Sequence, residues 1–166
     1  MIKPEKELNE ELLEILKNYQ GIIRKVSRIY FMNRDDREEN FQEVIYQIFK
    51  SYSGLNDKSK IGSWIYKVSI YTSIVKLRKE AMVSYPGKLP DCRDENHFEN
   101  EFQHNEEIQR LYKAIYQLNE IEKAIILLYL EEKDYKEISE ITGISKTNIG
   151  VKIMRIKEKL KGLLNQ

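Results

Sequence analysis

The sequence predicts an all-α protein made of two small helical domains joined by an acidic linker, with a helix-turn-helix in the second domain. Apolar residues recur every three or four positions along most of the 166-residue chain. Glycine and proline are scarce, at 7 and 3 residues, and no alternating strand pattern lasts long enough to compete with helices. The helical periodicity fails over residues 83–105, which leaves one domain over 1–82 and another over 106–166.

The first domain carries three amphipathic stripes, and each predicts a helix. The first stripe is formed by Leu12, Leu16, Tyr19, Ile23, Val26 and Tyr30. The second is formed by Phe41, Val44, Ile45, Ile48, Phe49 and Tyr52, and Ser53-Gly54 ends it. The third is formed by Ile61, Trp64, Ile65, Val68, Thr72 and Val75. Trp64 lies on this stripe and is expected in the core, whereas Tyr66 and Tyr71 lie nearer its edge and are expected at the surface.

The segment 83–105 has the composition of a linker. It contains two of the three prolines, at Pro86 and Pro90, and few apolar residues that could be buried. Residues 91–107 hold seven acids and one cation. Cys92 is the only cysteine, which excludes a disulfide framework, and its spacing to His97 and His104 matches no compact zinc motif. We therefore expect no metal and no cofactor.

The net charge of +1 conceals charge blocks of opposite sign. Residues 58–79 hold six cations and no acid, and residues 145–161 hold six cations and one acid. These blocks predict contacts with a polyanion at two places, on either side of the acidic segment. No apolar run approaches the length of a membrane span, and the first residues lack the apolar stretch of a signal peptide, so we expect a cytoplasmic protein.

Residues 134–164 form the most specific local pattern. Asp134 is a good N-cap with Glu137 three residues later, Gly143 suits a left-handed C-cap, and Ser145 is a second N-cap. Two helices around a tight glycine turn are typical of a helix-turn-helix, although an ordinary hairpin with a solvated basic face has the same spacing. The candidate DNA-binding residues at the start of the second helix and off its apolar stripe are Ser145, Lys146, Thr147, Asn148, Gly150, Lys152 and Arg155.

Five segments together resemble the bacterial extracytoplasmic-function group of RNA polymerase sigma factors. In the first domain these are the segments 39–45 (ENFQEVI), 64–68 (WIYKV) and 77–79 (LRK). In the second domain they are the segment 118–130 that leads into the turn motif and the motif itself, 134–145. The resemblance covers nearly everything from about residue 9 to 164, and the order and spacing of the motifs match across both domains.

The resemblance implies partners and roles. Such factors bind core RNA polymerase, through the β′ clamp helices and the β flap, and direct it to promoter DNA; an anti-sigma factor is a further expected partner. The residues that would face the clamp helices are Glu39, Phe41, Gln42, Glu43 and Ile45. Those that would hold the −10 element and an extruded base are Lys58, Lys60, Ser63, Lys67, Tyr71, Lys76, Arg78 and Lys79. The second domain would read the −35 element, and the acidic linker would lie in the channel that RNA later occupies.

Two departures from the family pattern fall at predicted DNA-binding positions. The usual Asn and Asp of the −10 helix stand here as Tyr71 and Val75, and the common Lys-Ser-Arg of the recognition helix stands as Gly150-Val151-Lys152. Two other function classes remain open from the residues alone: a stand-alone helix-turn-helix regulator that dimerises through its N-terminal helices, and a helical adaptor that inhibits transcription. An enzyme has no catalytic constellation behind it.

Overall fold

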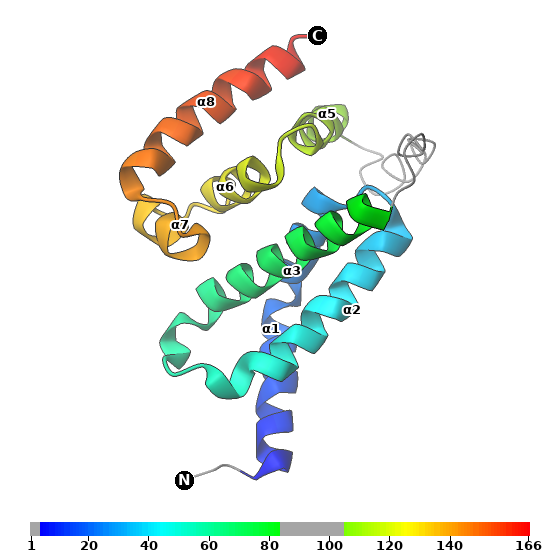
Figure 1. Ribbon diagram of the computed structural model, residues 1–166, viewed down its shortest axis with the longest axis vertical. Coiled ribbons are helices and arrows are strands. Elements are labelled where there is room, and N and C mark those ends of the chain that lie inside the picture. The colour runs from blue at the N-terminus through cyan, green and yellow to red at the C-terminus, as the bar shows by residue number, and fades with distance from the viewer. Residues whose placement is uncertain (1–3, 84–104) are drawn as a thin grey trace.

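The computed structural model describes residues 4–83 and 105–166, and these residues form helices and short turns with no β-strand (Figure 1). The first half contains α1 (Glu5–Tyr30), α2 (Arg34–Ser51) and α3 (Ile61–Val83). Two 3-10 turns, η1 (Tyr52–Gly54) and η2 (Lys58–Lys60), join α2 to α3, and η1 falls at the predicted Ser53-Gly54 break. The all-α class predicted from periodicity is confirmed.

The second half contains α5 (Glu106–Tyr116), α6 (Glu120–Leu130), α7 (Tyr135–Thr142) and α8 (Lys146–Leu164). Side chains at Asn105 and Asn119 cap α5 and α6 by accepting backbone N–H bonds, and Glu122 completes a capping box on α6. The predicted linker lies outside the described residues over 84–104, as do Cys92, His97, His104 and most of the acidic run. Among the described helices, none combines the length and apolar content needed to cross a bilayer.

A buried polar contact fixes the three helices of the first half to one another. The Asn40 side chain on α2 is fully buried and donates to Ser27 Oγ on α1 and to Ser73 Oγ on α3, both at 2.9 Å. Apolar residues of the first two predicted stripes, such as Leu12, Ile23 and Val44, form a buried cluster in the same half. Because each bond joins different helices, this contact specifies their relative rotation as well as their association.

The two halves share one core. Tyr30 on α1 and Tyr66, Ile70 and Ile74 on α3 belong to the same buried cluster as the apolar residues of α5 to α8. The expectation that Tyr66 lies at the surface is wrong, since its side chain is only 3% exposed. The reason is that α3 is buried on two sides, against α1 and α2 and against α7, so its apolar stripe is wider than a single-faced helix requires.

Polar contacts surround this shared core. Tyr30 Oη donates to the Glu120 carbonyl oxygen at 2.6 Å, and burial first, with the Glu120 charge, raises the pKa of Tyr30. The two Glu131 carboxylate oxygens accept from Lys25 Nζ at 2.9 Å, and one of them also accepts from Tyr66 Oη at 3.2 Å. Lys123 lies 4.2 Å from the Tyr116 ring centroid, and burial lowers its pKa to about 8. The second half is therefore docked on the first by both apolar and polar groups.

Candidate nucleic-acid and polymerase interfaces

The α7–α8 pair has the geometry of a helix-turn-helix. Asp134 Oδ1 accepts from the Glu137 amide at 2.8 Å, and Ser145 Oγ accepts from the Asn148 amide at 3.3 Å, so both predicted N-caps are present. Gly143 ends α7 with a φ of 77°, the left-handed conformation that a side chain disfavours. This turn fixes the direction in which α8 leaves the core.

The outer face of α8 is open to solvent. Its buried stripe consists of Ile149, Ile153, Ile156 and Leu160, which pack towards α5, α6 and α7. Figure 1 shows α8 on the outside of the second half, with α6 between it and α3. Of the predicted −35 contacts, five are exposed and two, Gly150 and Lys152, are half-buried. The exposed five are Ser145, Lys146, Thr147, Asn148 and Arg155.

Gly150 has a packing role that sequence reasoning did not identify. A Cβ at this position would lie 3.4 Å from the Tyr135 ring of α7. The residue thus faces the neighbouring helix, and a Cβ there would be in ordinary van der Waals contact with the Tyr135 ring. Lys152 stands near the buried stripe on the other flank of the helix, because it precedes Ile153 and follows Ile149 by three positions.

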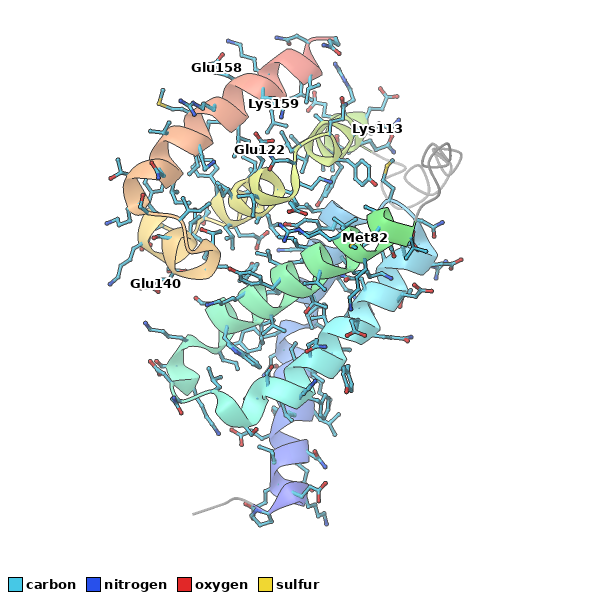
Figure 2. All side chains as sticks on the ribbon, viewed as in Figure 1. Met82, Lys113, Glu122, Glu140, Glu158 and Lys159 are labelled. Carbon is cyan, nitrogen blue, oxygen red and sulfur yellow. The ribbon has the colours of Figure 1, made fainter. Side chains whose placement is uncertain are left out.

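The C-terminal half of α8 is tied back to α6. Lys159 Nζ lies 3.0 Å from Glu122 Oε2, and Lys157 Nζ donates to Tyr129 Oη at 2.6 Å. Figure 2 shows Lys159 and Glu122 facing each other between the two helices, whereas Glu158 lies on the outer side. These contacts engage two cations of the C-terminal half of α8 with α6, while Lys146 and Arg155 are exposed nearer its start.

The predicted −10 residues fall into an exposed row and a set of paired cations. Ser63, Lys67, Tyr71 and Lys79 follow one another at intervals of four or eight along α3, so neighbouring members of this row lie close together while the row winds around the helix. Lys67, Tyr71 and Lys79 are exposed and Ser63 is half-buried. Val75, at the remaining position of this row, is also exposed. Tyr71 is 48% exposed, as the sequence predicted.

The other four predicted −10 residues lie against carboxylates of the same chain. Lys58 Nζ is 2.8 Å from Glu11, and that hydrogen bond raises the pKa of Lys58. Arg78 pairs with Glu120 of α6, whose hydrogen bond and charge raise the Arg78 pKa. The two remaining pairs are Lys60 with Glu140 of α7 at 4.0 Å, and Lys76 with Glu39 and Glu80 at 3.0 and 2.9 Å. The second half thus supplies the partner of Arg78 and of Lys60.

Lys76 stands at the centre of an acidic group on α2 and α3. Burial works to lower the pKa of Lys76, but the hydrogen bonds that its ammonium group donates to Glu80 and Glu39 outweigh this effect, and the net pKa is raised. Asp36 lies beside these groups, and its pKa is raised, first by burial and then by the Glu80 charge. The ammonium group therefore neutralises much of the local negative charge.

The predicted polymerase-facing residues lie on α2 with unequal exposure. Gln42 and Glu43 are exposed, and Glu39 is exposed while paired with Lys76. Phe41 and Ile45 are half-buried, and the Arg24 guanidinium covers the Phe41 ring at 4.3 Å from its centroid. Phe41 and Ile45 therefore contribute mainly to packing within the first half, and offer little exposed area to a partner.

Two aromatic residues that are not among the predicted polymerase-facing residues lie on the same face of α2. Tyr46 is 59% exposed and Phe49 is 39% exposed, and both follow Gln42 at helical spacing. The signal that could have identified them is this spacing, four and seven residues after Gln42. The periodicity predicts Phe49 in the buried stripe because Ile48 and Phe49 are adjacent and both apolar.

A groove of about 640 Å³ joins the α2 and α3 surfaces. Glu39, Glu43 and Gln47 line it from α2. The α3 residues that line it include Tyr71, Val75, Lys76 and Lys79. The residues that the sequence assigned to polymerase and to the −10 element therefore meet along one groove.

Comparison with known proteins shows similarity to sigma factors in both halves of the chain. Residues 108–160 match the model of sigma-70 region 4, a span that runs from α5 to the end of the buried stripe of α8. The RNA polymerase sigma factor SigV of Bacillus subtilis (strain 168) is 27% identical over 132 residues, which cover 76% of this chain and 74% of that protein. Residues 108–160 are thus similar to a sigma-70 region 4, and about three quarters of the chain is similar to an RNA polymerase sigma factor.

The fold of this chain also matches a solved structure over nearly its whole length. The sigma factor RpoE, solved in complex with the anti-sigma factor NepR from Bartonella quintana, superposes with a TM-score of 0.68 at 18% identity. The match covers 96% of this chain and 98% of that chain. The likeness therefore includes α1 to α3 as well as the region 4 helices.

Proposed function

We propose that this chain is an RNA polymerase sigma factor of the extracytoplasmic-function group, which binds core RNA polymerase and directs it to promoters by recognising a −10 and a −35 element. The observation that carries the proposal is the α7–α8 pair, whose exposed basic helix start coincides with the region 4 match. A helix N-terminus carries a positive dipole end and free N–H groups, which suit a phosphate beside the major groove. The action is one of binding, and the proposal assigns no catalytic residue.

In this proposal the −35 element is contacted by the start of α8, and the −10 element by α3. The −35 residues are those assigned from the sequence, and Gly150 among them also faces the Tyr135 ring of α7. The exposed row of Lys67, Tyr71 and Lys79 is the first contact for the −10 element. Lys60 and Arg78 become available when DNA replaces the carboxylates of Glu140 and Glu120.

The polymerase contact in this proposal is the exposed face of α2. Gln42 and Glu43 supply polar groups, and Tyr46 and Phe49 supply apolar area of the kind that dominates protein interfaces. We retain residues 1–82, 83–105 and 106–166 as the proposed polymerase and −10 domain, linker and −35 domain. We also propose an anti-sigma factor as regulator, since the solved relative RpoE is in complex with one.

The test of this function is reconstitution. The purified chain is mixed with bacterial core RNA polymerase, and transcription is measured from a library of genomic promoters. We expect specific transcripts only when both components are present, from start sites preceded by two shared sequence boxes. A stable homodimer that protects a palindrome without polymerase would instead support the stand-alone regulator.

Replacing Gln42 and Glu43 together by alanine is expected to weaken polymerase binding by about tenfold or more. Loss of interface contacts worth about 1–2 kcal/mol gives a change of this size. Binding is measured by competition with a labelled sigma factor for core polymerase. Gln20→Ala, at an exposed position of α1, is the matched control and should bind as the unmodified chain does. Full binding by the double variant would place the polymerase contact elsewhere.

Arg155→Ala is expected to reduce transcription that depends on the −35 element by about 10-fold to 100-fold, since an arginine contact to a base contributes about 1–3 kcal/mol. Lys152→Ala should have a smaller effect, because Lys152 is half-buried on the flank of α8. If Lys152 contacts a phosphate, its removal lowers the salt slope of binding by about one. Both variants should bind polymerase normally, and the exposed Lys17→Ala serves as the control for loss of charge.

A further inference from the structure

The outermost positions of α8 include two large apolar side chains. Thr147, Val151, Met154 and Glu158 lie four, three and four residues apart, on the side opposite the buried isoleucines. Val151 is 43% exposed and Met154 is 71% exposed. Neither side chain belongs to the buried cluster of the second half or to the half-buried residues that pack against it. Packing within the described residues therefore does not account for their apolar character.

The surroundings of these two side chains are cationic and polar. Lys146, Asn148 and Arg155 are exposed at neighbouring positions of the same helix. The whole segment 145–161 has six cations against the single acid Glu158, which lies towards the C-terminal end. An apolar centre framed by cations matches a ligand that offers apolar groups between two rows of phosphates. This charge pattern favours duplex DNA over a protein surface as the occupant.

We propose that Val151 and Met154 read the methyl groups of thymines in the −35 element. The proposal rests on the proposed function and specifies what its recognition helix reads. The C5-methyl group of thymine is the apolar feature that bases present in the major groove, and apolar side chains recognise it by contact. Three residues of α-helix rise about 4.5 Å, which is close to the roughly 3.4 Å between successive bases. Val151 and Met154 therefore face adjacent base pairs, while Arg155 supplies hydrogen bonds beside them.

The test removes single methyl groups from the DNA. The preferred −35 element is first selected from a randomised library with the holoenzyme formed by this chain and core polymerase. Each thymine of the selected element, on either strand, is then replaced by deoxyuridine, which lacks only the methyl group. We expect one or two replacements to weaken holoenzyme binding by about fourfold each, the effect of one buried methyl group.

The variants assign each methyl group to a side chain. Met154→Ala and Val151→Ala should each weaken binding to the thymine element and each abolish the effect of deoxyuridine at one position. Leu130→Ala, which removes an exposed apolar side chain at the end of α6, should keep the full deoxyuridine effect. Measuring all four proteins on both DNAs gives the coupling between one side chain and one methyl group.

Three results would overturn the inference while leaving the proposed function intact. These are a selected element without any required A·T pair, deoxyuridine replacements without effect, and a deoxyuridine effect that survives both alanine variants. In the second case the apolar pair would be free to contact a protein partner instead. A holoenzyme that selects no −35 sequence at all would contradict the proposed function itself, so the two failures are distinguishable.

Discussion

Asn40→Ala is expected to lower the free energy of unfolding by about 3 kcal/mol, because it removes two buried hydrogen bonds and leaves the hydroxyl groups of Ser27 and Ser73 without their shared partner. For a protein of this size that corresponds to a fall of roughly 6–12 °C in melting temperature. The effect is large because Asn40 connects α2 to both α1 and α3 from a fully buried position. Urea denaturation followed by circular dichroism measures it.

A triple variant separates the hydrogen bonds from the packing at this site. Replacing Asn40 by leucine together with Ser27→Ala and Ser73→Ala removes all three polar groups, and should recover most of the lost stability. Asn40 Oδ1 is itself buried without a hydrogen-bond partner among the described groups, so an apolar side chain also removes that cost. Asn18→Ala, on the exposed side of α1, is the control. A loss below about 0.5 kcal/mol for Asn40→Ala would show that the contact is dispensable.

The local elements of this protein could be predicted from the sequence because local signals determine them. The stripe from Leu12 to Tyr30 gave α1, and the caps at Asp134, Gly143 and Ser145 gave the turn between α7 and α8. The acids Asp35 and Asp36 lie in the first turn of α2 behind the Asn33 cap, where a negative charge stabilises the helix start. Periodicity and capping need no knowledge of distant residues.

What the sequence could not predict depends on contacts between distant segments. The apolar positions of α3 are spread around the helix. The periodicity predicts a single buried stripe, whereas the structure buries two faces. The cations of residues 58–79 formed a continuous basic block in the sequence, yet four of them lie against acids from α1, α2, α3, α6 or α7. The number of charges in a segment does not indicate which acids its cations will pair with in the fold. The exposure of Val151 and Met154 could not be predicted either, because apolar residues in an amphipathic helix are expected to be buried.

The docking of the two halves leads to the second large effect, at Tyr66. Its ring lies in the shared core, its hydroxyl donates to Glu131 at 3.2 Å, and Lys133 Nζ lies 5.6 Å from the ring centroid. Tyr66→Ala is expected to lower the free energy of unfolding by about 3–4 kcal/mol, the range for truncating a buried aromatic side chain. Tyr66→Phe keeps the ring and should cost about 1 kcal/mol.

Because Tyr66 lies between the two halves, its loss should change their packing as well as lower the free energy of unfolding. Tyr52 is similarly buried, but its ring packs within the core of the first half, against residues such as Trp64. Tyr52→Ala should therefore destabilise the first half without moving the second, whereas Tyr66→Ala removes apolar contact that holds α6 and α7 against α3. Energy transfer between dyes on α1 and α8 should fall for Tyr66→Ala alone under native conditions. Equal transfer in the two variants would mean that the remaining contacts, chiefly those of Tyr30 and Glu131, hold the halves together without Tyr66.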